Sequence, residues 1–83
     1  MNSEANELKE HEQDLERLCQ SKCDEFAILG YLKISKQDIW DCVTAKYRKG
    51  YPPLYQIVSD ILSLKVTDYM NWATLSAIKG KRF

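Results

Sequence analysis

The 83-residue sequence contains only one histidine, three glycines and three cysteines. The lone histidine, His11, gives no Ser/His or Cys/His pair for nucleophilic catalysis, and three glycines are too few for a glycine-rich phosphate loop. We therefore expect no catalytic residues and no enzyme activity. No run of about 18 apolar residues occurs, so we expect no membrane-spanning helix. The polar, acidic N-terminal segment is unlike a secretory signal, and we expect a cytoplasmic protein.

Cys19, Cys23 and Cys42 form an odd set, which argues against a disulfide framework and fits a reducing compartment. Cys19 and Cys23 are spaced to share a metal ion on one helix face. His11, however, lies about 12 Å from Cys19 along a helix, and no fourth ligand is evident. We therefore interpret the cysteines as apolar core residues and expect no metal site and no cofactor.

Charge is balanced over the whole chain but distributed unevenly along it. Residues 1–30 contain eight acidic and three basic side chains (net −5), whereas residues 31–83 contain four acidic and nine basic ones (net +5). The two halves can neutralise each other within the chain, across a homo-oligomer, or against separate partners. A locally basic face can also attract nucleic acid.

Apolar residues recur at helical spacing, and the length suits one domain over residues 1–83. We predict an all-α fold, a small bundle of about four helices with the first helix longest. The first helix is expected over residues 4–29, with Ser3 as N-cap, Gly30 at C′, and Lys22 and Cys23 on the edges of its apolar face. Residues 1–10 and 80–83 are the parts expected to fray.

The second helix is predicted to start at a capping box formed by Ser35 and Asp38 and to stop at Gly50. Its apolar stripe is Ile39, Trp40, Val43 and Tyr47.

Two further helices are predicted after Pro52 and Pro53. The third is amphipathic, with Pro53 near its first turn and Asp60 facing solvent. Thr67 is expected to cap the fourth, which is apolar nearly all round.

The run from Lys46 to Tyr51 alternates bases with aromatic residues. Lys and Arg can bind phosphates while tyrosine rings stack on unpaired bases. The candidate RNA-binding residues are therefore Lys46, Tyr47, Arg48, Lys49 and Tyr51, and Lys33 and Lys36 are candidates to widen the patch. The alternative interpretation is structural, because cations are favoured at a helix C-terminus and Tyr47 falls on the apolar stripe.

Tyr69, Met70 and Trp72 occur within four residues of one predicted helix. Aromatic residues and methionine are enriched at protein interfaces, so these three are candidate protein-interaction residues. The alternative is that they fill the core of a small domain.

Several segments of the chain resemble a known family. They are Lys22–Phe26, Leu29–Tyr31, Asp38–Trp40, Tyr55–Leu64 and Val66–Asn71, and DILSLKVTDYMN is the most specific block. Together they resemble the ComN-type post-transcriptional regulators of Bacilli over roughly residues 20–80. The resemblance implies a small helical protein without enzyme activity that controls messenger RNA in genetic competence and contacts other proteins. Where the family usually shows a tryptophan-and-lysine run, this chain has Ala45–Lys49.

Two functional hypotheses follow. In the first, the protein binds mRNA through the basic and aromatic run after the second helix. In the second, it is an adaptor that binds another protein through the face around Trp72, without direct nucleic-acid contact. A DNA-binding helix-turn-helix is a weaker third option, because no helix is rich in base-reading Arg, Asn or Gln.

Overall fold

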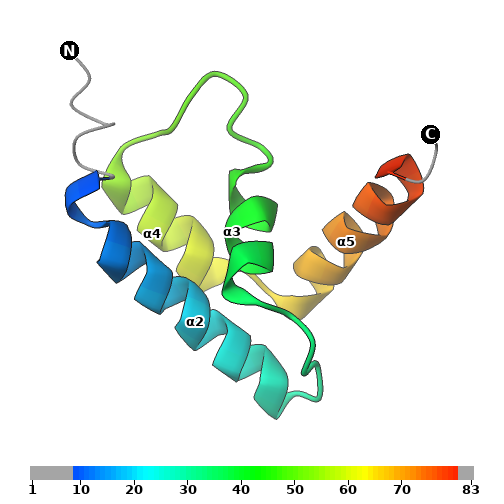
Figure 1. The fold of residues 1–83 in the computed structure, drawn as a ribbon. Helices are drawn as coiled ribbons and strands as arrows, with labels where there is room; N and C mark the ends of the chain where they lie inside the picture. Colours follow the sequence, from blue (N-terminus) through cyan, green and yellow to red (C-terminus); the bar gives the residue numbers. More distant parts are fainter. Residues whose placement is uncertain (1–8, 81–83) are drawn as a thin grey trace.

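The computed structural model describes the backbone of residues 9–80 and the side chains of residues 9–77. This range contains four helices and no strand: α2 (Glu12–Ile28), α3 (Lys36–Thr44), α4 (Leu54–Ser63) and α5 (Val66–Gly80) (Figure 1). The predicted all-α class is confirmed, and α2, with 17 residues, is the longest helix. The predicted N-cap Ser3 lies outside the described residues, as does most of the chain expected to fray.

Helix α3 is the central element of the packing. It packs against α2, α4 and α5, and α2 also packs against α4. Figure 1 shows α2 and α4 side by side, with α5 diverging from them on the far side of α3. The molecule measures 38 × 33 × 16 Å, so it is flat and leaves much of each helix facing solvent.

The core consists of apolar residues from all four helices. Phe26, Ile39, Ile57 and Ile61 are fully buried, and each such side chain contributes about 1.5–3 kcal/mol relative to an exposed one. The other buried apolar residues are Leu15, Cys19, Cys23, Val43 and Tyr69. Cys42 is half-buried and packs against this core. The interpretation of the cysteines as apolar packing residues is therefore confirmed, and Cys23 lies inside the core rather than on its edge.

Helix α2 ends in the turn that its sequence predicts. Gly30 has a positive φ of 104°, which favours glycine, and its N–H donates to the Ala27 carbonyl at 2.9 Å. The N–H of Tyr31 donates to the Phe26 carbonyl at 2.9 Å. These two bonds form a Schellman motif with Gly30 at C′.

Helix α3 begins as predicted and ends earlier than predicted. The Ser35 N–H donates to Asp38 Oδ2 at 2.9 Å and the Asp38 N–H donates to Ser35 Oγ at 3.1 Å, which completes the capping box. The helix stops at Thr44 rather than at Gly50. The Tyr47 N–H bonds to the Thr44 carbonyl at 3.0 Å in a tighter turn, so Tyr47 leaves the helical stripe.

Helix α4 starts directly after Pro53, as predicted, but α5 does not start at Thr67. Helix α5 begins at Val66, and the Asp68 carboxylate accepts the Lys65 N–H at 3.3 Å. Lys65 therefore occupies the cap position, and Asp68 supplies the capping oxygen from the third helical residue, where the helix dipole favours negative charge.

Lys22 is buried, contrary to its predicted place on the edge of α2. Its side chain is 5% exposed, and Nζ donates to the Leu62 carbonyl at 2.9 Å and pairs with Glu25 at 3.1 Å. The last four carbonyls of a helix have no partner within it, so Lys22 satisfies one at the end of α4. No helix within residues 9–80 is long and apolar enough to cross a bilayer.

Candidate functional site

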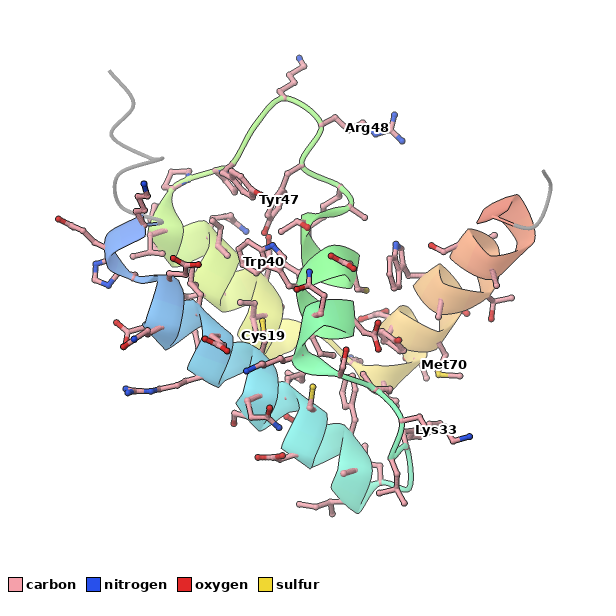
Figure 2. All side chains as sticks on the ribbon, viewed as in Figure 1. Cys19, Lys33, Trp40, Tyr47, Arg48 and Met70 are labelled. Carbon is pink, nitrogen blue, oxygen red and sulfur yellow. The ribbon has the colours of Figure 1, made fainter. Side chains whose placement is uncertain are left out.

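The connection between α3 and α4, residues 45–53, is here called the basic loop. It contains all five predicted RNA-binding residues: Lys46, Tyr47, Arg48, Lys49 and Tyr51. Arg48 and Lys49 are exposed, and Figure 2 shows the Arg48 side chain extending away from the helices. The loop itself contains three basic residues and no acidic one, so it is a local concentration of positive charge.

Asp60 of α4 anchors the start of the basic loop. Its carboxylate accepts a hydrogen bond from Tyr47 Oη at 2.5 Å and another from Gln56 Nε2 at 2.9 Å, and it pairs with Lys46 Nζ at 3.4 Å. The Asp60 side chain is only 11% exposed, so the prediction that it faces solvent is wrong. A helical wheel places it on the polar side of α4, and only the tertiary fold brings the loop over it.

The pKa values of this cluster follow from burial and hydrogen bonding. Burial alone would raise the pKa of Asp60, but the hydrogen bonds from Tyr47 and Gln56 and the nearby Lys46 ammonium lower it overall. Burial, followed by the hydrogen bond to Asp60, raises the pKa of the Tyr47 phenol. Asp60 therefore stays ionised at neutral pH and holds a protonated Tyr47.

Three aromatic rings pack together at the basic loop. The Tyr51 ring lies 6.1 Å from that of Trp40, tilted by 30°, and 6.2 Å from that of Tyr47 in an edge-on arrangement. Tyr51 is 47% exposed, whereas Trp40 and Tyr47 are half-buried. The structure thus adds Trp40 to the site, which the sequence assigned only to the apolar stripe of α3.

Lys33 and Lys36 do not widen the basic patch. Lys36 pairs with Glu16 of α2. Lys33 lies in the connection between α2 and α3, and Figure 2 shows it far from Arg48. The proposed extension of the basic patch to Lys33 and Lys36 is therefore wrong.

The three protein-interaction candidates on α5 differ in exposure. Tyr69 is 8% exposed, and its ring lies 6.2 Å from Phe26 and 5.7 Å from Trp72. Trp72 is half-buried against the core, and Met70 is 39% exposed. Tyr69 is thus a core residue, as the alternative interpretation had it. Burial alone does not test a protein-binding role, which stays a prediction for these residues.

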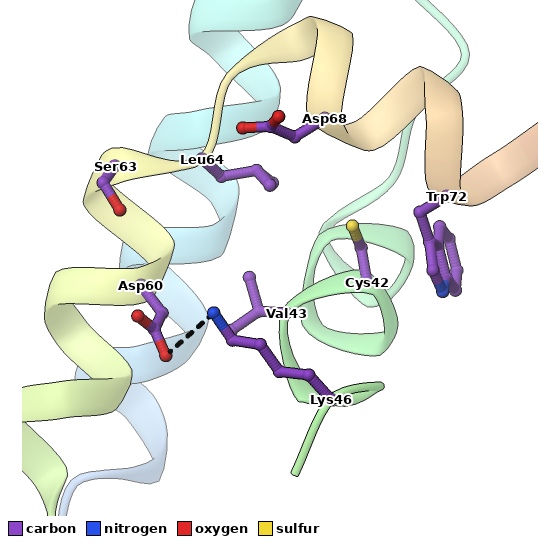
Figure 3. Close-up of a pocket in the computed structure, with 8 residues that line it drawn as sticks. All are labelled: Cys42, Val43, Lys46, Asp60, Ser63, Leu64, Asp68 and Trp72. Carbon is purple, nitrogen blue, oxygen red and sulfur yellow. Dashed lines mark ion pairs between the residues drawn. The ribbon is translucent and has the colours of Figure 1, made fainter.

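A groove of about 270 Å³ lies between α3, the end of α4 and α5 (Figure 3). The Lys46–Asp60 ion pair forms part of its wall, with Trp72 of α5 lining it as well. Burial raises the pKa of the Cys42 thiol in this groove to about 11, so it is a poor nucleophile. The remaining lining residues are Val43, Ser63, Leu64 and Asp68. Within the described residues, no three His, Cys, Asp or Glu side chains are grouped to hold a metal ion.

Comparison with known proteins places the chain in a family. The profile of the family described as "Post-transcriptional regulator" matches residues 8–83. The chain is 39% identical over 61 residues to the post-transcriptional regulator ComN of Bacillus subtilis (strain 168). That alignment covers 71% of this chain and 62% of the relative, so the chain spans less than two thirds of the relative's length. No solved structure matches the chain. The match over nearly the whole sequence shows that the chain belongs to the post-transcriptional regulator family.

Proposed function

We propose that the protein regulates messenger RNA, in competence gene expression, by binding single-stranded RNA through the basic loop. The observation that supports this proposal best is the exposed pair of cations, Arg48 and Lys49, beside the half-exposed ring of Tyr51. The family is one of post-transcriptional regulators, which act on RNA directly or through other proteins. We propose no catalytic step and no cofactor. We propose that the target is messenger RNA in the cytoplasm.

The chemistry of the loop fits unpaired RNA better than a duplex. Arg48 and Lys49 provide charge for backbone phosphates, and an RNA base can stack on the exposed face of the Tyr51 ring. The neighbouring Trp40 ring packs against Tyr51 and helps to hold it in place. A ring can stack in this way only on bases that are not already stacked in a helix. We therefore expect the protein to prefer single-stranded leaders or loops.

Asp60 has a positioning role in this proposal. It fixes Tyr47 and neutralises part of the Lys46 charge, so Arg48 and Lys49 are the cations left to meet phosphates. It also keeps the loop close to α4. We expect the loop to present its charges in a similar arrangement before and after RNA binding, which reduces the entropy lost on association.

The test is a titration of a single-stranded leader RNA with the purified protein at several salt concentrations. The wild type should bind more weakly as salt rises, because phosphate contacts release counterions. R48A/K49A should bind more weakly and should lower the slope of log K against log salt by about 1.4, about 0.7 for each lost phosphate contact. The matched control K33A/K65A removes the same charge outside the loop and should behave like the wild type. Equal binding by both double variants, or no binding by the wild type, would contradict direct RNA contact.

The alternative proposal is a protein adaptor that makes no direct RNA contact. It is supported by exposed apolar residues on α5, where Met70 is 39% and Leu75 is 59% exposed. Capture of a protein partner from cells that is lost with M70A but kept with R48A/K49A would favour the adaptor. Both results are compatible with the family, so the RNA titration and the capture experiment together separate the proposals.

A further inference from the structure

The C-terminal half of α5 extends beyond the shared core. Along the described chain, Trp72 and Ala73 are the last residues that pack against the core, and residues 74–77 are all exposed. Figure 1 shows this half of α5 standing apart from the other three helices. The sequence from Tyr69 to Ile78 nevertheless contains no charged residue, whereas the outer face of a surface helix is typically charged. Leu75 in the projecting half is 59% exposed.

Intrinsic helix propensity does not account for the projecting half. Thr74, Ser76 and Ile78 are weaker helix formers than Ala or Leu. Ten consecutive uncharged residues also leave this part of α5 without ion pairs between neighbouring turns. A helix of this length is marginal in water unless a face of it packs against another element. We therefore expect a packing partner for this half of α5.

Four residues of α5 form one stripe with a charge at each end. Asp68, Trp72, Leu75 and Lys79 are separated by four, three and four positions, which is the spacing of a coiled-coil seam on one helix face. We call these four residues the α5 stripe. Figure 3 shows Asp68 and Trp72 on the same side of the helix, where both line the groove. The backbone of the last turn of α5 places Lys79 on the stripe.

The order of charges makes the α5 stripe complementary to itself. Asp68 and Lys79 lie equally far from the centre of the stripe, as do Trp72 and Leu75. In an antiparallel pair of α5 helices, Asp68 of one copy therefore lies opposite Lys79 of the second copy, and Trp72 lies opposite Leu75. A parallel pair would place like charges opposite each other at both ends. The antiparallel pair also sets the positive end of each helix dipole beside the negative end of the other.

Asp68 is available for a contact with a cation from outside the chain. It is exposed, and the hydrogen bond that its carboxylate accepts comes from the Lys65 N–H at 3.3 Å. Lys46, which lines the same groove, pairs with Asp60 instead. None of the ion pairs between described side chains includes Asp68. Charge complementarity thus favours a second copy, which supplies a cation at the matching position.

We propose that α5 pairs antiparallel with α5 of a second copy of this chain through the α5 stripe. The two-fold axis passes between Trp72 and Leu75, so each contact occurs twice and the assembly closes at two copies. One pair of 15-residue helices belongs to the small class of interfaces, and we expect a weak dimer with a dissociation constant on the order of 100 μM. This inference is independent of the RNA proposal, because the α5 stripe and the basic loop share no residue.

The test is sedimentation equilibrium of the full chain at concentrations from about 10 μM to about 1 mM. The wild type should change from monomer to dimer over this range. L75S should raise the dissociation constant at least about tenfold, because each dimer loses two leucine side chains from its contact. The matched control L62S removes a leucine of similar exposure (57%) on α4 and should dimerise like the wild type. R48A/K49A should also dimerise like the wild type.

Charge reversal tests the antiparallel register. D68K and K79D each place like charges opposite one another at both ends of the pair, so each variant alone should dimerise at least about threefold more weakly at low salt. An equimolar mixture of the two variants brings opposite charges together again and should form a heterodimer of about wild-type strength. The control D24K makes the same charge reversal on α2 and should dimerise like the wild type. If D68K melts early because α5 loses its capping carboxylate, K79D alone should still weaken dimerisation.

Four results would overturn the inference. The first is a wild type that stays monomeric over the whole concentration range. The second is an L75S variant that dimerises as strongly as L62S. The third is a mixture of D68K and K79D that associates no more strongly than either variant alone. The fourth is a monomeric wild type that captures a different protein through Leu75, which would assign the α5 stripe to a foreign partner.

Discussion

The hydrogen bond between Tyr47 and Asp60 is the contact whose removal most directly tests how the basic loop is held. Y47F deletes the phenol hydroxyl that donates to the carboxylate at 2.5 Å and keeps the ring beside Tyr51. D60N removes the charge and keeps the shape. We predict that each variant destabilises the protein and that the double variant is little worse than either, because both weaken the same charge-assisted hydrogen bond. Y47F removes its donor, whereas D60N keeps an accepting oxygen and removes the charge.

The magnitude follows from burial. A hydrogen bond to a charged group contributes about 1.5–3 kcal/mol, and the Asp60 side chain is only 11% exposed, so water screens it little. Lys46 is 64% exposed and adds at most about 1 kcal/mol. We therefore expect Y47F to lower the free energy of unfolding by about 2 kcal/mol. In a domain of this size that corresponds to a Tm lowered by roughly 8–16 °C.

The assay is a urea unfolding titration at neutral pH, monitored by far-UV circular dichroism. It is carried out on the wild type, both single variants and the double variant. Y55F is the matched control, because Tyr55 is 74% exposed, and it should change stability by less than about 0.5 kcal/mol. A coupling energy between Tyr47 and Asp60 below about 0.5 kcal/mol would refute the view that this bond anchors the loop. So would a Y47F variant as stable as Y55F.

Three further predictions concern pH, the buried lysine and the thiols. The pKa of Asp60 is lowered in the folded state, so the ionised carboxylate stabilises the fold at neutral pH, and this stabilisation is lost as pH falls below about 4. The Tm difference between wild type and D60N should therefore shrink over that pH range. K22M keeps most of the apolar stem but leaves the Leu62 carbonyl without its charged donor, and it should lower the free energy of unfolding by about 2 kcal/mol in urea titrations; unchanged stability would mean that water replaces the ammonium. Burial raises the pKa of Cys19 and Cys42 to about 11, so an aromatic disulfide reagent at pH 8 should react about a hundredfold slower with the native than with the unfolded protein; equal rates would show that these thiols are open to solvent.

The features that sequence analysis predicted correctly are local ones. The Ser35–Asp38 capping box, the turn at Gly30 and the start of α4 after Pro53 each depend on residues within three or four positions of one another. The all-α class follows from apolar spacing, which is a property of each helix alone. The basic loop itself could be located because its bases and aromatic residues are consecutive.

The errors about charged side chains all involve contacts between distant residues, whereas the end of α3 at Thr44 and the start of α5 at Val66 differ from the prediction through local hydrogen bonds. The position of Asp60 on the polar side of its own helix predicts a solvent-exposed carboxylate. In the structure this carboxylate accepts a hydrogen bond from Tyr47, which lies 13 positions earlier in the chain. Lys22 is buried because a carbonyl 40 positions away accepts its ammonium. Lys36 pairs with Glu16 of another helix instead of extending the basic patch. No periodicity within a helix contains this information.

Sequence patterns were enough to predict the capping box of α3, the turn at Gly30, the start of α4 and the residue types of the basic loop, because capping, turn formation and hydropathy act over one or two helical turns. The tertiary structure alone decided which charges remain available. It joined Tyr47 and Lys46 to Asp60 and buried Lys22 at the end of α4. A buried or screened charge depends on the elements packed against it, and that packing is set by the core that the helices share.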